Sequence, residues 1–189
     1  MGGNKLAKAV DELIEELRER EGEQDKMLPK TREIVRECSL AIRAIHSAEI
    51  SKSKEHLKKA DSLLAECRKT KNFEYLLEQP LQEICEAKTL LAIVERKELP
   101  TFKDLNMNFN VYLLGLCDLI GELRRHMLEN LRKEKKEEAE YFFAKMNEIY
   151  DALLPIRFSN SLLPGFRKKQ DVARMQVEQA RSEITRSRH

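Results

Sequence analysis

The sequence has 189 residues, of which 36% are charged and 6% aromatic, with six glycines, five prolines and no tryptophan. This length and composition fit one globular domain that is large enough to bury a core. The 35 basic and 33 acidic residues leave a net charge of only +2, which excludes a protein that binds nucleic acid through overall positive charge. No stretch reaches the roughly 18 apolar residues of a membrane span, and the N-terminus lacks an apolar signal-peptide core. We therefore expect a soluble, cytoplasmic protein.

Helical periodicity runs through the whole chain, and no alternating β-branched pattern competes with it. We predict an all-α protein with a single domain over residues 1–189 and a frayed tail at about 185–189. Gly22 is predicted to end the first helix, and Pro29 suits the first turn of the second. The predicted helices span residues 5–21, 28–48, 51–70, 73–97, 107–134, 136–154 and 165–186.

The four cysteines are far apart in the sequence and form no C-x-x-C pair of the kind found in zinc sites. Each lies within a helical pattern, so we interpret all four as buried thiols that act as small apolar residues. Such cysteines are typical of a reducing compartment. They are Cys38, Cys67, Cys85 and Cys117.

Two acidic residues interrupt an otherwise apolar helical segment in the second half of the chain. Asp118 and Glu122 are one helical turn apart in the segment 111–126, just after Gly115. A carboxylate in such a place is costly unless it is paired or binds a metal. The segment 81–94 carries a second pair, Glu83 and Glu86, also on a largely apolar face. We predict that the four carboxylates converge between two helices.

Clustered carboxylates are hard oxygen ligands that suit Mg²⁺ or Mn²⁺, and such ions support phosphodiester hydrolysis. A di-iron carboxylate bundle is excluded because it requires Glu-x-x-His motifs, which the sequence lacks. The alternative is a structural one, in which Asp118 pairs with Arg124, Arg125 or a basic residue of another helix. His126, four residues after Glu122, either assists the acidic site or simply packs beside it.

A row of basic side chains follows one edge of the second predicted helix. Arg32, Arg36, Arg43 and His46 recur at helical spacing, opposite an apolar face that includes Ile34. Arginines in such a row suit the phosphates of a nucleic-acid backbone. An exposed face that exchanges salt bridges with neighbouring helices explains the same pattern.

The segment 112–125, YLLGLCDLIGELRR, resembles the signature of the translin family, in particular the branch of translin-associated factor X. The segment 81–87, LQEICEA, is similar to the other acidic segment of that branch, and residues 32–46 resemble its basic helix. The resemblance covers most of the chain in the same helical order. The shorter length and the compact turn between the fourth and fifth helices resemble a stand-alone, archaeal-type member.

The resemblance implies a seven-helix bundle that assembles into a hollow homo-oligomer, with an octamer favoured, and that binds single-stranded RNA and single-stranded DNA. It implies a Mg²⁺-dependent endoribonuclease whose catalytic and metal-binding residues are Glu83, Glu86, Asp118 and Glu122. A non-catalytic single-stranded nucleic-acid-binding oligomer and a helical scaffold without nucleic acid are the alternatives. Whether a translin-type partner subunit is required stays open.

Overall fold

The computed structural model describes residues 5–71 and 73–187, and within these ranges it contains only helices, turns and loops. The prediction of an all-α protein is therefore confirmed. The described part has six α-helices and one short 3-10 helix. They are α1 (Lys5–His46), α2 (Ile50–Cys67), η1 (Glu74–Leu77), α3 (Glu78–Val94), α4 (Phe109–Arg132), α5 (Lys136–Leu153) and α6 (Phe166–Ser187).

The prediction of seven helices is wrong for the described residues, because the first two predicted helices form one 42-residue helix, α1. Gly22 does not adopt the left-handed conformation that would end a helix, and Pro29 lies inside α1. The proline removes one backbone hydrogen bond, the one to the carbonyl of Asp25. Asp25 and Pro29 are both exposed, so water can bind that carbonyl in place of the missing donor.

Three predicted helix ends, at residues 48, 97 and 134, lie within three residues of the observed ends, although the residue that closes each helix is not glycine. The backbone of Ala48, Arg96 and Glu134 is left-handed, with φ near 60° in each case. At each end the N–H groups of the left-handed residue and of the residue after it donate hydrogen bonds to carbonyl oxygens of the last helical turn, as in Glu49 N to Ala44 O at 2.8 Å. The tail that we predicted to be frayed from residue 185 is helical as far as Ser187, and residues 188–189 lie outside the described part.

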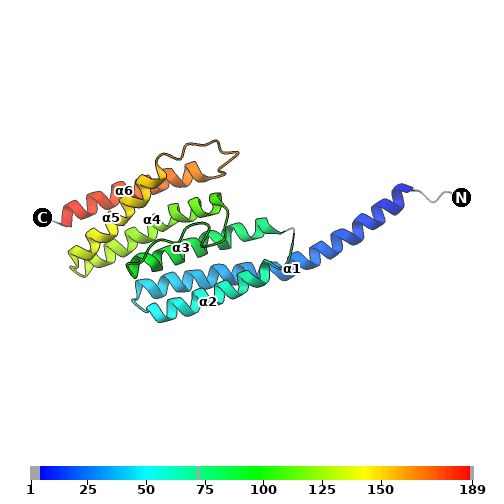
Figure 1. The fold of residues 1–189 in the computed structure, drawn as a ribbon, viewed down its shortest axis with the longest axis horizontal. Coiled ribbons are helices and arrows are strands. Elements are labelled where there is room, and N and C mark those ends of the chain that lie inside the picture. The colour runs from blue at the N-terminus through cyan, green and yellow to red at the C-terminus, as the bar shows by residue number, and fades with distance from the viewer. Residues whose placement is uncertain (1–4, 72, 188–189) are drawn as a thin grey trace.

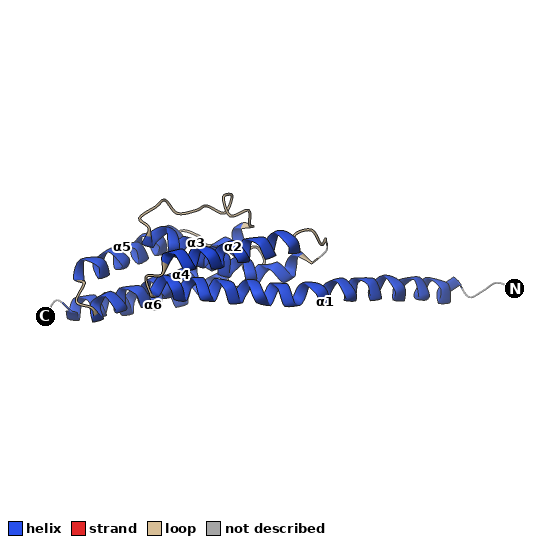
Figure 2. Ribbon diagram, turned by 90° about the horizontal axis from the view of Figure 1, so that it is seen from below, coloured by secondary structure: helices blue, strands red, loops and turns tan. Residues whose placement is uncertain are grey.

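The helices pack as a bundle with α3 and α4 in its middle, α1 and α2 on one side, and α5 and α6 on the other (Figure 1). The second half of α1 packs against α2 and α3, and α4 packs against α3, α5 and α6. The first half of α1 extends well beyond the bundle, as Figure 2 shows from a second direction. Every residue from 5 to 21 is exposed, including Leu6, Leu13 and Leu17. The core therefore begins near Met27 and includes α1 only from there onward.

The four cysteines are buried and free, as predicted. Burial raises the pKa of the Cys85 and Cys117 thiols to about 12, so neither is a nucleophile at neutral pH. None of the helices in the described ranges has the length and apolar character needed to cross a membrane.

Candidate active site

The predicted acidic residues lie where α3 and α4 pack most closely. A Cβ atom built on Gly115 of α4 would lie 2.7 Å from the Cβ of Cys85 and 3.0 Å from the carbonyl oxygen of Gln82. Only glycine allows this approach. Gln82 and Cys85 stand beside Glu83 and Glu86 on α3, and Asp118 is one turn after Gly115 on α4. The glycine thus brings the two acidic pairs to one place.

We expect Gly115→Ala to destabilise the fold by about 1–3 kcal/mol, because its methyl group would lie too close to the Cβ and Sγ atoms of Cys85. Thermal or urea unfolding would measure the loss. Gly121→Ala is a matched control on the same helix, since a Cβ at Gly121 meets no atom within 4 Å. A Gly115→Ala variant as stable as the control would show that α3 and α4 separate at little cost.

The four acidic residues interact electrostatically. Burial, and after it repulsion from Glu83, Asp118 and Glu122, raises the pKa of Glu86 to about 8. Burial and then the charge of Asp118 also raise the pKa of Glu83. A raised pKa means that the ionised form is disfavoured in the folded protein. The cluster therefore holds more negative charge than its surroundings neutralise.

Lys169 of α6 supplies a positive charge to this cluster, and the prediction did not include it. Its ammonium group donates a hydrogen bond to Asp118 Oδ2 and another to Gln82 Oε1, the latter at 2.9 Å. Its charge lowers the pKa of both Glu83 and Glu86. The structural alternative considered above for Asp118, a basic partner from another helix, is therefore what the geometry shows. The sequence pattern could have indicated this inward position, because Lys169 lies on the same face of α6 as the buried Ala173, Val177 and Ala180.

His46 lies against Glu122 rather than on the exposed edge with the arginines. Its side chain is 9% exposed, and its Nε2 donates to Glu122 Oε2 at 2.5 Å. This hydrogen bond lowers the pKa of Glu122 below its usual value. The other ring nitrogen of His46 is 3.1 Å from Nδ1 of His126, whose ring packs on Phe142. Burial lowers the pKa of His126 to about 4, so His126 is neutral at pH 7.

The predicted phosphate-binding arginines are all exposed on α1. Arg36 is 3.2 Å from Glu33, whereas Arg43 has no ion pair or hydrogen bond with any side chain in residues 5–71 and 73–187. Arg43 and His46 face a cavity that they share with three arginines of α4, Arg124, Arg125 and Arg132. The prediction treated α1 alone and missed these three residues, because nothing in the sequence showed that the end of α1 lies beside α4.

The donor set of the acidic site is suitable for a hard divalent cation, but the side chains are not arranged around one. No three His, Cys, Asp or Glu side chains in the described ranges come close enough to hold a metal ion as they stand. Asp118 is held by Lys169, and Glu122 by His46. Glu83 and Glu86 have no such cationic partner among the ion pairs of the described part.

Sequence comparison identifies the family. The model of the translin family matches residues 6–182, which is nearly the whole chain. The chain belongs to the translin family. The chain is also 32% identical over 191 residues to an uncharacterized protein of Methanocaldococcus jannaschii, a match that covers 95% of this chain and 84% of that protein.

Solved structures support the translin fold over the full length. The chain is similar to AfC3PO in a complex with duplex RNA, with 29% identity, a TM-score of 0.86, and coverage of 95% of this chain and 96% of that one. Another AfC3PO structure gives 30% identity, the same TM-score and coverage of 95% and 97%. Apo-NeC3PO, at 22% identity and a TM-score of 0.83 over 94% and 96% of the two chains, shows the fold alone.

Proposed function

We propose that this translin-family protein is a Mg²⁺-dependent endoribonuclease that acts on single-stranded RNA. The observation that carries the proposal is the half-buried group of four carboxylates between α3 and α4, in which burial and mutual repulsion raise the pKa of Glu83 and Glu86. Structural ion pairs usually remove such repulsion, whereas a site for a cation retains it until the cation binds. The similar AfC3PO complex with duplex RNA supports RNA as the ligand.

Glu83, Glu86 and Asp118 would hold the Mg²⁺ or Mn²⁺ ion, and Glu122 would complete the site or position a water molecule. When bound, the ion would activate water and stabilise the leaving oxygen of the phosphodiester. His46 orients the Glu122 carboxylate through the 2.5 Å hydrogen bond and keeps it ionised. The ammonium group of Lys169 competes with the ion for Oδ2 of Asp118, and it becomes available to a phosphate when the ion takes its place. Exposed arginines of α1, namely Arg32, Arg36 and Arg43, would attract the backbone phosphates.

Incubation of labelled RNA with the protein and Mg²⁺, with and without EDTA, tests the proposal. Both a single strand and a duplex of the same sequence are needed, because the AfC3PO complex contains a duplex. We expect the single strand to be cut internally in Mg²⁺ and to stay intact in EDTA. Cleavage that persists in EDTA, or an intact single strand in Mg²⁺, would contradict the proposal.

A non-catalytic RNA- or DNA-binding protein is the second candidate, and one observation favours it. Asp118 already has a cationic partner in Lys169, and no three potential metal ligands in the described ranges lie close together. In this case the carboxylates would be structural, and RNA would bind without being cut. The same experiment separates the two functions, because a filter-binding measurement on the EDTA sample detects binding without cleavage.

We further propose that the protein forms a homo-oligomer, with an octamer favoured. Leu6, Val10, Leu13 and Leu17 are all exposed at successive spacings of four, three and four residues, which is the pattern of a helix that packs against a partner. Light scattering at micromolar concentration should therefore give a mass several times that of the 22.1 kDa chain. A mass near 22 kDa would refute assembly and leave the nuclease proposal standing.

A further inference from the structure

The end of α1 and the second half of α4 enclose a cavity of about 430 Å³ that is rich in arginine. Arg43 of α1 and Arg124, Arg125 and Arg132 of α4 line it, together with His46. Glu129 also lines the cavity, but its carboxylate is bound by Arg132 at 2.7 Å and Lys133 at 3.0 Å. The cavity therefore carries a clear excess of positive charge.

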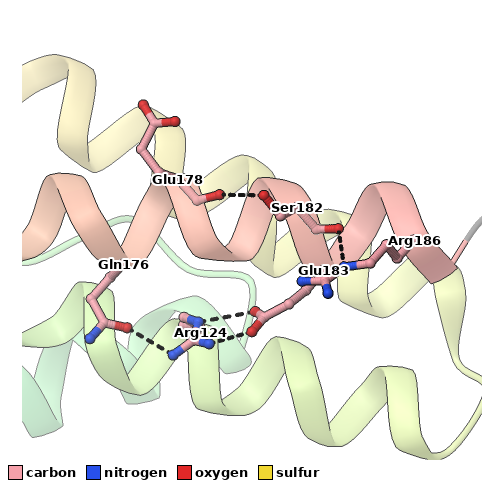
Figure 3. A network of polar contacts seen from close by, with 6 residues as sticks. All are labelled: Arg124, Gln176, Glu178, Ser182, Glu183 and Arg186. Atoms are coloured by element: carbon pink, nitrogen blue, oxygen red, sulfur yellow. Dashed lines mark hydrogen bonds and ion pairs between the residues drawn. The ribbon is translucent and has the colours of Figure 1, made fainter.

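Two of these arginines are fixed by neighbouring side chains. Arg124 donates to both carboxylate oxygens of Glu183 and to Oε1 of Gln176, both of which come from α6 (Figure 3). Arg132 binds Glu129 through two of its nitrogens. Each of the two guanidinium groups is thus held in place and has its charge balanced by a carboxylate, although Arg124 uses three and Arg132 two of their five N–H donors.

Arg43 and Arg125 remain available. Arg43 is exposed, and its side chain has no ion pair or hydrogen bond among the residues described. Arg125 is 61% exposed, and within residues 5–71 and 73–187 its only ion pair is a long one, 3.5 Å from Glu122. A guanidinium group offers a planar set of N–H donors that matches two oxygens of a phosphate. Two guanidinium groups that face one cavity and have unused donors are therefore suited to an anionic group such as a phosphate rather than to a neutral ligand.

Glu122 connects this cavity to the acidic site. It contacts His46 and Arg125 on the cavity side, and its charge raises the pKa of Glu83 and Glu86 on the other side. A strand that passes over Glu122 would thus have one phosphate near the carboxylates and a neighbouring phosphate near Arg43 and Arg125.

We propose that the arginine cavity binds a phosphate of the RNA strand next to the one at the acidic site. The inference rests on the proposed function in that it takes RNA as the ligand. It assigns the strongest phosphate contact to Arg43 and Arg125, from two different helices, and leaves Arg32 and Arg36 with general electrostatic attraction only.

A comparison of two double variants tests the assignment. The cavity variant, Arg43→Gln with Arg125→Gln, removes the two available guanidinium groups from the cavity. The control variant, Arg32→Gln with Arg36→Gln, removes the same number of charges from exposed positions elsewhere on α1. Because the loss of charge is equal, the difference in affinity reports the cavity alone. Fluorescence anisotropy with labelled single-stranded RNA at 150 mM salt and with EDTA measures binding without requiring cleavage.

We expect the cavity variant to bind RNA at least about tenfold more weakly than the control variant. Equal weakening of the two variants would overturn the cavity and leave the proposed function intact. Absence of RNA binding by the wild-type protein would overturn both.

Competition with a mononucleotide and with inorganic phosphate distinguishes the source of the phosphate. If a mononucleotide binds as tightly as RNA and only the cavity variant loses it, the cavity is a small-ligand site and the RNA assignment is wrong.

Discussion

Replacement of Glu86 by glutamine is expected to stabilise the metal-free protein at pH 8 and to abolish RNA cleavage. The pKa of Glu86 is raised to about 8 in the folded protein from a usual value of 4.5. A carboxyl group with a raised pKa costs no stability below pH 4.5 and costs progressively more up to pH 8, because over this range the unfolded chain releases the proton while the folded protein keeps it. Glutamine removes this cost, which we place at about 2–4 kcal/mol at pH 8.

Thermal melts at pH 4.5 and pH 8, without metal, measure the effect. The melting temperature of Glu86→Gln should exceed that of the wild type at pH 8, and the difference should shrink at pH 4.5. Glu78→Gln is a control on the same helix, because Glu78 is exposed and should change stability little. A large loss of stability at pH 8 together with retained cleavage would mean that Glu86 is half of a structural pair, and the nuclease assignment at this residue would then fail.

Lys169→Met is expected to lower the stability of the metal-free protein slightly and to increase the stabilisation by divalent metal. The substitution removes the charge that lowers the pKa of Glu83 and Glu86, so both carboxyl groups become harder to ionise. Lys169 and Asp118 are each about one-third exposed, so we expect a loss near pH 8 of only about 1 kcal/mol. By the same reasoning as for Glu86, the loss should grow as the pH rises from 4.5 to 8.

Added Mg²⁺ should raise the melting temperature of Lys169→Met by more than that of the wild type, because the ion no longer competes with an ammonium group for Asp118. Lys168→Met is the matched control, since Lys168 is the preceding residue and is exposed. Equal responses of the two variants to Mg²⁺ would show that the ion does not enter the acidic site. This measurement needs no RNA, so it tests metal binding independently of cleavage.

The local chemistry of the acidic site could be predicted from the sequence because it depends on spacing along single helices. Asp118 and Glu122 share a face by helical geometry, and their apolar neighbours indicate that this face packs against the bundle, where the structure leaves both side chains half-buried. Contacts between distant segments leave no such pattern. Lys169 is 51 residues from Asp118, and His46 is 76 residues from Glu122. Only the packing of α6 and α1 against α4 brings these partners together.

The number of helices was predicted wrongly because residue type was taken as a fixed signal of where a helix ends. Gly22 and Pro29 disfavour a helix by a few kcal/mol at most, and neither position requires a turn. Conversely, Ala48 and Glu134 close helices from the left-handed region without glycine. In both situations the local preference of one residue does not by itself decide where a helix ends.

The first half of α1 also determines how this protein should respond to dilution. A helical stretch of 17 exposed residues, 5–21, has little tertiary support within a single chain, and isolated helices of that length are only marginally stable in water. Its amide hydrogens should therefore exchange with solvent almost as fast as those of a peptide whenever the chains are separate. In an assembly that covers Leu6, Leu13 and Leu17 the same amides would be protected. Exchange in this one segment would then follow protein concentration, while exchange in the bundle from Met27 onward would not.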